Sequence, residues 1–271
     1  MRKKETTNTK FSLQNRTIAV IGAASGIGEA VAIACAECGG NVIIADLDNE
    51  GLFRVAAEIS SSEGECESHD LDICDENGVG EFLRDIDSRF GLDAVVATPA
   101  LNIRQPITAY SSAEVDRIID VNLKGGFYVL NIAGNLMSNR GKGSIVLFSS
   151  IRGKVVEAGQ GIYAATKGAI EQLVRASSAE LGPSGVRVNA LAPGIVTTPL
   201  TQQIQSNPDW HKAYASHSVF NRWATPEEIA WPTVFLLSEA ASFITGSVLY
   251  VDGGWTAIDG RFNPPSMETS R

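Results

Sequence analysis

The sequence predicts a single-domain α/β fold, in which a doubly wound parallel sheet carries helices on both faces. Two observations lead to this prediction. The chain has 271 residues, of which 44% are hydrophobic, and this is enough for one large core but cramped for two. Short β-branched runs alternate with helix-length amphipathic segments along the whole chain. Such alternation is typical of parallel strands joined by crossover helices.

Six runs rich in Val, Ile and Ala are predicted to be strands. They are TIAVIG, NVIIAD, DAVVA, GSIVLFSS, VRVNALA and SVLYVDGG. No repeat or composition break divides the chain, so we expect one domain over residues 13–257, with a polar tail at 1–12 and a second tail at 258–271. Residues 199–225 are polar, aromatic and irregular, which favours a lid over a site.

Composition excludes several classes of function. The net charge of −9 disfavours nucleic acid as a partner, and no apolar run is long enough to span a membrane. The basic start of the chain has no apolar segment behind it, so it resembles a tail more than a signal peptide. Four cysteines indicate a reducing, cytoplasmic setting. Cys35 and Cys38 form a CxxC, but they lie in an Ala-rich helical pattern, which favours core packing over a metal site.

A glycine turn follows the first predicted strand and opens a helix. The turn runs Gly22-Ala-Ala-Ser25-Gly26-Ile27-Gly28, with the spacing GxxxGxG. Glycines in this position let backbone N–H groups approach a pyrophosphate at the positive end of a helix. The context of strand, turn and helix therefore predicts a Rossmann-type dinucleotide site.

The second predicted strand ends in Asp46. A carboxylate at this position can accept hydrogen bonds from the adenosine ribose hydroxyls and would repel a 2′-phosphate. Asp48 adds to this repulsion, and the glycine turn contains no Lys or Arg. The sequence therefore predicts NAD as the cofactor. The alternative is a solvated acid at the end of a strand.

Four polar residues downstream suggest proton chemistry. Tyr163 and Lys167 lie four positions apart and share one face of a predicted helix, Ser150 ends a strand, and Asn122 lies in the segment DVNLKGGF. A neighbouring cation can lower the pKa of a phenol enough for it to act as a base. Ser150 would then hydrogen-bond a substrate oxygen while Tyr163 exchanges its proton, and Asn122 would hold a water that links Lys167 to solvent.

Together these motifs resemble the short-chain dehydrogenase/reductase family from about residue 13 to 257. This resemblance implies a sheet of about seven parallel strands, catalysis by the Asn-Ser-Tyr-Lys set, no metal, and a homotetramer. It also implies further cofactor contacts. These are Asp72, Ile73, Ala97, Tyr163, Lys167, Pro193, Ile195 and Thr198.

The chain departs from the family pattern at two places. Ile21 stands where the family commonly has a Thr whose hydroxyl braces the glycine turn. The usual Asn-Asn-Ala-Gly after the fourth strand of the family fold is replaced by Ala97-Thr98-Pro99-Ala100, which removes side-chain amides and a backbone donor. These changes put the local cofactor contacts in question but leave the catalytic set complete.

The substrate is less clearly encoded. Arg104, Arg152 and Gln160 are candidate substrate contacts, with Asn102 and Lys154 nearby in sequence. A cation facing the pocket would favour an anionic group. We therefore expect a small polar hydroxy compound, such as a sugar, polyol or hydroxy acid. The alternative is that these cations are solvated loop charges.

The sequence favours an NAD(H)-dependent oxidoreductase that interconverts a secondary alcohol and a ketone. Two other functions stay open. A 3-oxoacyl-thioester reductase is disfavoured by Asp46, because biosynthetic reduction generally uses NADPH. A non-catalytic dinucleotide-sensing regulator would be expected to have a damaged Tyr-Lys pair, whereas Tyr163 and Lys167 are both present.

Overall fold

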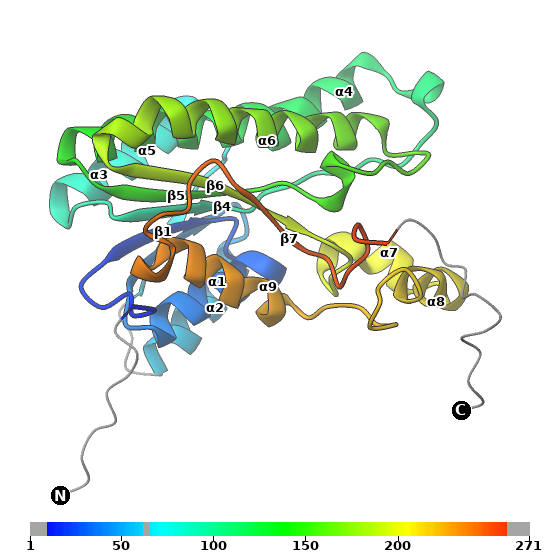
Figure 1. Cartoon of the computed structure of the whole chain (residues 1–271), viewed down its shortest axis with the longest axis horizontal. Helices are drawn as coiled ribbons and strands as arrows, with labels where there is room; N and C mark the ends of the chain where they lie inside the picture. The colour runs from blue at the N-terminus through cyan, green and yellow to red at the C-terminus, as the bar shows by residue number, and fades with distance from the viewer. Residues whose placement is uncertain (1–9, 62–65, 259–271) are drawn as a thin grey trace, which may run out of the picture.

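A computed structural model describes residues 10–61 and 66–258, and these residues build a seven-stranded parallel sheet (Figure 1). The strand order is β3-β2-β1-β4-β5-β6-β7. The strands are β1 (Thr17–Ile21), β2 (Asn41–Asp46), β3 (Cys66–Asp70), β4 (Ala94–Ala97), β5 (Gly143–Phe148), β6 (Val186–Pro193) and β7 (Val248–Val251). This confirms the predicted fold class.

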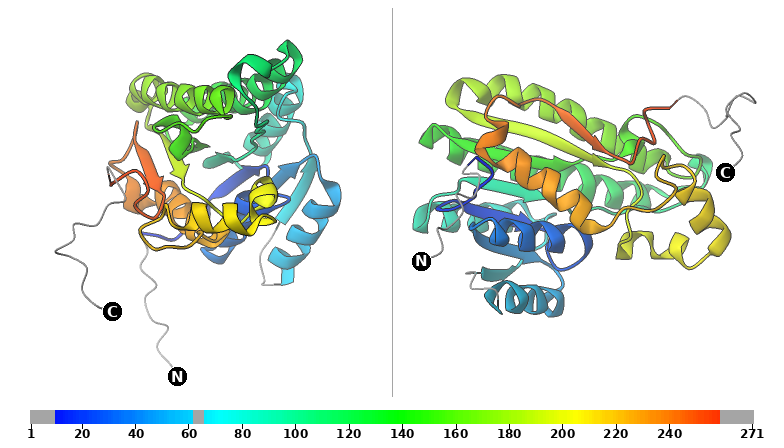
Figure 2. Two further views of the ribbon diagram at one scale, coloured as in Figure 1. Left: turned by 90° about the vertical axis from the view of Figure 1, so that its right-hand side faces the viewer. Right: turned by 60° about the horizontal axis from the view of Figure 1, so that its bottom comes forward.

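Helices cover both faces of the sheet. Figure 1 shows α1, α2 and α9 on one face and α3, α5 and α6 on the other, and the rotated views of Figure 2 keep these layers apart. The helices are α1 (Gly26–Glu37), α2 (Asn49–Ser61), α3 (Glu76–Arg89), α4 (Ser112–Ile119), α5 (Gly126–Arg140), α6 (Gly161–Leu181), α7 (Gln202–Gln205), α8 (Pro208–Ala215) and α9 (Pro226–Leu237). Shorter helical turns are η1 (Ile107–Ala109), the π-helix η2 (Asp120–Gly125), η3 (Ile151–Gly153), η4 (Gly182–Ser184), η5 (Pro199–Thr201) and η6 (Glu239–Ala241).

The core consists of two apolar layers, one on each side of the sheet. One layer joins α1, α2 and α9 to side chains such as Val20 and Ile44, and the other joins α3, α5 and α6 to side chains such as Ile21 and Ile43. Successive strand residues face opposite layers, so a strand buried on both faces is apolar at every position. This explains the continuous Val and Ile runs in the sequence.

Strand β3 is the element that periodicity did not reveal. Its sequence, CESHD, contains a single apolar residue, and its side chains are at most partly buried. It forms the edge of the sheet and pairs with β2 alone. An edge strand is held by its backbone ladder and needs little apolar burial, so composition gives a weak signal for it.

The order of the strands determines where a crevice opens at the carboxyl edge of the sheet. Strand β1 lies between β2 and β4, so the connections after β1 and β4 leave to opposite faces and open a crevice at the carboxyl ends of these strands. Figure 1 shows α7 and α8 beyond this end of the sheet. Most of the two predicted tails, 1–12 and 258–271, lies outside the described residues. Within the described ranges, no helix is both long and apolar enough to span a membrane.

Candidate active site

The turn between β1 and α1 requires glycine for steric reasons. Gly22 and Gly26 have φ values of +86° and +59°, in the left-handed region that favours glycine. A Cβ on Gly28 would lie 1.9 Å from the carbonyl oxygen of Gly22. The backbone is therefore packed closely enough that a side chain would displace it, while the first N–H groups of α1 face the crevice.

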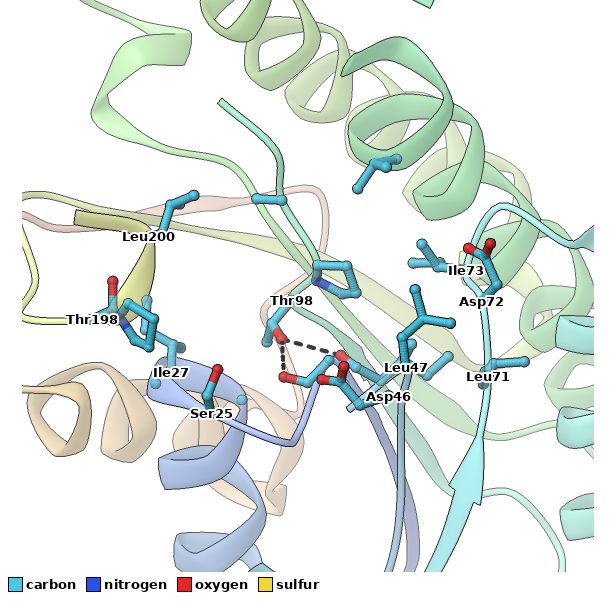
Figure 3. A pocket seen from close by; sticks show the side chains of 18 residues that line it. Ser25, Ile27, Asp46, Leu47, Leu71, Asp72, Ile73, Thr98, Thr198 and Leu200 are labelled. Atoms are coloured by element: carbon cyan, nitrogen blue, oxygen red, sulfur yellow. Dashed lines mark hydrogen bonds between the residues drawn. The ribbon is translucent and has the colours of Figure 1, made fainter. Parts of the chain in front are cut away.

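A pocket of about 320 Å³ lies over this turn, and it brings together most of the residues predicted to bind the cofactor (Figure 3). Predicted contacts that line it are Gly22, Ser25, Gly26, Ile27, Gly28, Asp46, Asp72, Ile73 and Thr198. In Figure 3, Asp72 and Ile73 lie towards one end, Thr198 lies towards the other, and Asp46 lies between them. Ala97 and Pro193 are buried at the ends of β4 and β6 and are not lining residues, while Ile195 lines the neighbouring cavity.

The carboxylate of Asp46 is fixed at the end of β2. Its two oxygens accept hydrogen bonds from the backbone N–H of Ala24 at 3.1 Å and from that of Asp48 at 3.2 Å. No lysine or arginine is among the described residues that line this pocket. The nearby guanidinium of Arg54 is paired with the carboxylate of Glu29. An extended pocket with glycine amides and a carboxylate at one end fits a dinucleotide that lacks a 2′-phosphate.

Ser150, Tyr163 and Lys167 meet beside this pocket. Ser150 follows β5, and its hydroxyl oxygen accepts the backbone N–H of Arg152 at 3.2 Å. Tyr163 and Lys167 share one face of α6, where the Lys167 ammonium lies 5.5 Å from the centre of the Tyr163 ring and donates to the carbonyl oxygen of Phe148 at 2.9 Å. All three side chains are buried. The helix therefore positions a phenol and an ammonium group together in a site shielded from water.

Burial changes the pKa of both groups on α6. It raises the pKa of Tyr163, whereas a hydrogen bond with Ser150 and the positive charges of Arg152 and Arg104 lower it. Burial also lowers the pKa of Lys167 to about 8. From the sequence, Lys167 and the positive nicotinamide are expected to stabilise the phenolate, and the structure adds the guanidinium groups of Arg152 and Arg104.

Asn122 lies in the π-helix η2, between α4 and α5. Its amide nitrogen donates to the carbonyl oxygen of Leu101 at 2.9 Å and to the Thr166 hydroxyl at 3.2 Å, and its carbonyl oxygen accepts the Leu101 N–H at 2.7 Å. Both amide hydrogens are therefore used by protein atoms. Asn122 fixes the segment after β4 against α6, and its side-chain oxygen keeps one acceptor position, so its predicted contact with a water linked to Lys167 stays a prediction.

A second, smaller cavity of about 70 Å³ opens next to Ser150 and Tyr163. Its lining includes the predicted substrate contacts Arg104, Arg152 and Gln160. Arg152 is buried and the side chain of Arg104 is 20% exposed, so neither is a fully solvated loop charge, and Gln160 is buried beside them. Lys154 instead places its ammonium 5.0 Å from the centre of the Tyr250 ring and is not a lining residue.

Comparison with known proteins agrees with this geometry. A family model described as enoyl-(acyl carrier protein) reductase matches residues 22–256. The chain is 34% identical over 252 residues to 2-dehydro-3-deoxy-D-gluconate 5-dehydrogenase of Pseudoalteromonas atlantica, covering 91% of this chain and 98% of that protein. It is 37% identical over 245 residues to cis-4-hydroxycyclohexanecarboxylate dehydrogenase of Sinomonas cyclohexanicum, covering 90% and 97%.

A solved structure of gluconate 5-dehydrogenase from Burkholderia cenocepacia, in complex with NADP and tartrate, has a TM-score of 0.88 to this fold. Its sequence is 27% identical, and the match covers 92% of this chain and 98% of that one. The chain is a short-chain dehydrogenase/reductase. It is therefore an oxidoreductase that acts on CH–OH groups with a nicotinamide dinucleotide.

In this short-chain dehydrogenase/reductase, the altered segment after β4 supports the glycine turn. The sequence did not reveal this contact. The Thr98 hydroxyl lies 3.1 Å from the carbonyl oxygen of Ile21 and 3.0 Å from that of Gly22, as the dashed lines in Figure 3 show. A hydroxyl thus braces the glycine turn from β4, although Ile21 itself supplies none. The two departures from the family pattern compensate each other.

Replacing this hydroxyl should weaken cofactor binding. We expect Thr98→Val, which has nearly the same shape, to weaken NADH binding about fivefold, because one net hydrogen bond contributes roughly 1 kcal/mol. Thr98→Ser keeps the hydroxyl and should bind like the wild type. Titration of NADH fluorescence measures both affinities, and equal affinity of Thr98→Val and wild type would show that the brace is unimportant.

The predicted lid, residues 199–225, lies over the small cavity. It contributes Leu200, Thr201, Ile204 and Tyr214 to the lining. Ile204, Tyr214 and Trp223 form a small apolar cluster of their own, separate from the two main core layers. This segment therefore packs as a local unit against the site.

Two residues at the small cavity, Glu157 and Tyr214, could not be predicted from the sequence. Glu157 is the acceptor for both arginines that line it, and Tyr214 of the lid donates to the same carboxylate at 2.6 Å and 2.5 Å from its two oxygens. Neither residue belongs to a motif. Their role depends on loop packing between segments far apart in the sequence, which local spacing does not encode.

Proposed function

We propose that this enzyme is an NAD(H)-dependent dehydrogenase that interconverts a secondary alcohol and a ketone on a small polar, anionic substrate, such as a sugar acid or another hydroxy acid. The choice of NAD rests mainly on the Asp46 carboxylate at the ribose end of the cofactor pocket, where no cation lines the wall among the described residues. Three solved neighbours contain NADP, so the support for NAD comes from this chain's own residues.

The side chains divide the chemistry between them. When bound, the nicotinamide ring accepts or gives the hydride. Ser150 donates its hydroxyl hydrogen to the substrate oxygen, and Tyr163 takes the hydroxyl proton during oxidation or returns it during reduction. Arg152 and Arg104 lower the pKa of Tyr163 by their positive charge, and the Lys167 ammonium beside the Tyr163 ring would add to the stabilisation of the phenolate. The buried position of these groups strengthens every such interaction.

The anionic substrate is supported by the two arginines of the small cavity. Arg104 and Arg152 lie close enough to Tyr163 to lower its pKa, so a carboxylate paired with them would hold its alcohol carbon near the reacting phenol. Two relatives are named as dehydrogenases of a carboxylate-bearing alcohol, a deoxygluconate derivative and a hydroxycyclohexanecarboxylate.

The cofactor assignment is tested by removing the charge of Asp46. We expect the wild type to prefer NAD⁺ over NADP⁺, and Asp46→Asn to reduce this preference about tenfold or more, because a ribose contact is lost and a repulsion is relieved. Steady-state kcat/KM for both cofactors measures the change.

Asp48→Asn is the matched control, since the Asp48 side chain accepts the Gly51 N–H at 3.1 Å and an Asn oxygen can do the same. It should shift the preference much less than Asp46→Asn does. A wild-type enzyme that uses NADP⁺ as well as NAD⁺ would refute the assignment.

Reduction of a 3-oxoacyl thioester is the alternative enzyme function, and one relative, 31% identical over 243 residues, is named as a 3-oxoacyl-[acyl-carrier-protein] reductase. The small cavity, with two arginines beside Tyr163, supports a short anionic substrate better than a long acyl chain. NAD preference would further disfavour a biosynthetic reductase.

We also propose that the enzyme is a homotetramer in the cytoplasm. Large apolar side chains are exposed on α5 and near α9 and β7, namely Phe127, Trp231 and Phe243, as expected of surfaces that pair with other subunits. The four cysteines are free thiols, which is typical of a reducing compartment.

A further inference from the structure

Glu157 is the common acceptor of four side chains around the substrate cavity. Its carboxylate accepts from Arg104 at 3.2 Å and from Gln160 at 2.6 Å, and it is also bonded to Arg152. The fourth donor is the Tyr214 hydroxyl of α8. These donors come from the loop after β4, from η3, from the residue before α6 and from the lid. One carboxylate therefore orients the polar wall of the cavity.

Glu157 contacts the residues of this polar wall but does not itself line the cavity. Its four donors line the cavity beside Ser150 and Tyr163, whereas Glu157 does not. Two guanidinium groups and one carboxylate leave a net charge of +1 at this wall, since arginine stays protonated in proteins. A substrate with one negative charge would neutralise the wall, and a dianion would leave an excess charge in a partly buried site.

We propose that Glu157 is a specificity-determining residue that sets the charge of the substrate pocket, so that the enzyme selects a monocarboxylate over a neutral alcohol and over a dicarboxylate. The substrate carboxylate binds the faces of Arg104 and Arg152 that Glu157 leaves available. Glu157 is a positioning residue in this arrangement, because it touches the arginines and not the reacting atoms. The inference deepens the proposed function and rests on it for the position of the substrate.

Asn102 gives independent support for a polar ligand in this cavity. Its amide nitrogen donates to Gln160 at 2.8 Å, while its carbonyl oxygen is buried and has no hydrogen-bond partner among the described residues. A buried acceptor without a partner is costly. Because Asn102 also lines the cavity, a second hydroxyl group on the substrate would satisfy it.

The proposal is tested with three four-carbon probes that share a secondary alcohol and differ in charge: butane-1,3-diol (neutral), 3-hydroxybutyrate (one carboxylate) and malate (two). Binding of each to the complex of enzyme and NADH is measured by calorimetry. Wild type should bind 3-hydroxybutyrate about tenfold more tightly than either other probe. In Glu157→Gln, which keeps the side-chain shape and one of the two acceptor oxygens, the affinity ratio of malate to 3-hydroxybutyrate should rise by about tenfold.

Two further variants distinguish an effect of charge on binding from an effect of the substitution on folding. Glu81→Gln removes one exposed charge on α3, away from the cavity, and should leave all three affinities unchanged. The double variant Arg104→Gln/Glu157→Gln returns the wall to a net charge of +1, so its affinity ratio should move back towards the wild-type value even if absolute affinities are weaker.

The proposal is overturned if wild type does not prefer the monoanion, or if Glu157→Gln leaves the ratio where Glu81→Gln leaves it. This binding assay requires no turnover. Charge selection without any NAD⁺ reduction would therefore contradict the proposed function alone. Turnover that prefers hydroxy acids to neutral alcohols, with an affinity ratio of malate to 3-hydroxybutyrate that Glu157→Gln does not change, would contradict the inference alone.

Discussion

Tyr163→Phe is expected to lower kcat by about a thousandfold or more while NADH binds almost as it does to the wild type. The substitution removes only the phenol hydroxyl, which is the group that exchanges a proton with the substrate. The ring stays in place on α6, where it is buried beside the cofactor pocket. Single-turnover hydride transfer and NADH fluorescence titration measure the two quantities separately.

Tyr250→Phe is the matched control for this result. The Tyr250 hydroxyl donates to Glu171 at 3.2 Å and does not line either pocket, so its removal should leave kcat nearly unchanged. If Tyr163→Phe lost NADH binding and turnover equally, the hydroxyl would have a structural role. If it retained turnover, another group would be the proton carrier. A wild-type protein that binds NADH and never turns over would favour the dinucleotide-sensing regulator.

Lys167→Met should produce the second large effect, a loss of activity of about a hundredfold or more together with a more stable fold at neutral pH. Activity falls because the phenolate of Tyr163 loses a neighbouring cation. Stability rises because burial lowers the pKa of Lys167 from 10.5 to about 8, so charging it in the folded protein costs roughly 3 kcal/mol. The unpaired carbonyl oxygen of Phe148 would offset part of this gain.

The stability gained by Lys167→Met should depend on pH in a defined direction. Below pH 8, Lys167 is protonated in both the folded and the unfolded chain, and the folded protein carries the full cost. As the pH rises from 8 to 10.5, the folded lysine is neutral while the unfolded one still binds a proton, so the cost disappears. The excess stability of Lys167→Met in urea unfolding should therefore be largest below pH 8 and vanish near pH 10.5. A difference that is constant with pH would contradict the burial argument.

The sequence alone could predict the parts of this protein that depend on local spacing. The glycine turn, the carboxylate at the end of β2 and the Tyr-Lys pair on α6 all depend on residues near one another in the chain, and the structure places them around two adjoining pockets. Strand β3 could not be predicted from periodicity because an edge strand needs little apolar burial.

Contacts between segments that are far apart in the chain could not be predicted from the spacing of residues in the sequence. The hydroxyl of Thr98 braces the glycine turn from the segment after β4. The carboxylate of Glu157 accepts hydrogen bonds from donors in four separate segments. Both depend on loop conformations that bring distant residues together. Only the packed structure shows that Arg104 and Arg152 face the substrate cavity, whereas Lys154 contacts Tyr250 instead.

The most direct test of the central claim is NAD⁺ reduction at 340 nm over a panel of neutral polyols, sugars and hydroxy acids, with NADP⁺ run in parallel. We predict turnover with NAD⁺ on a hydroxy monocarboxylate, at a kcat/KM higher than on the matching neutral alcohol. Turnover that requires NADP⁺, or that is as fast on neutral alcohols as on their carboxylates, would contradict the functions assigned to Asp46 and to the two arginines.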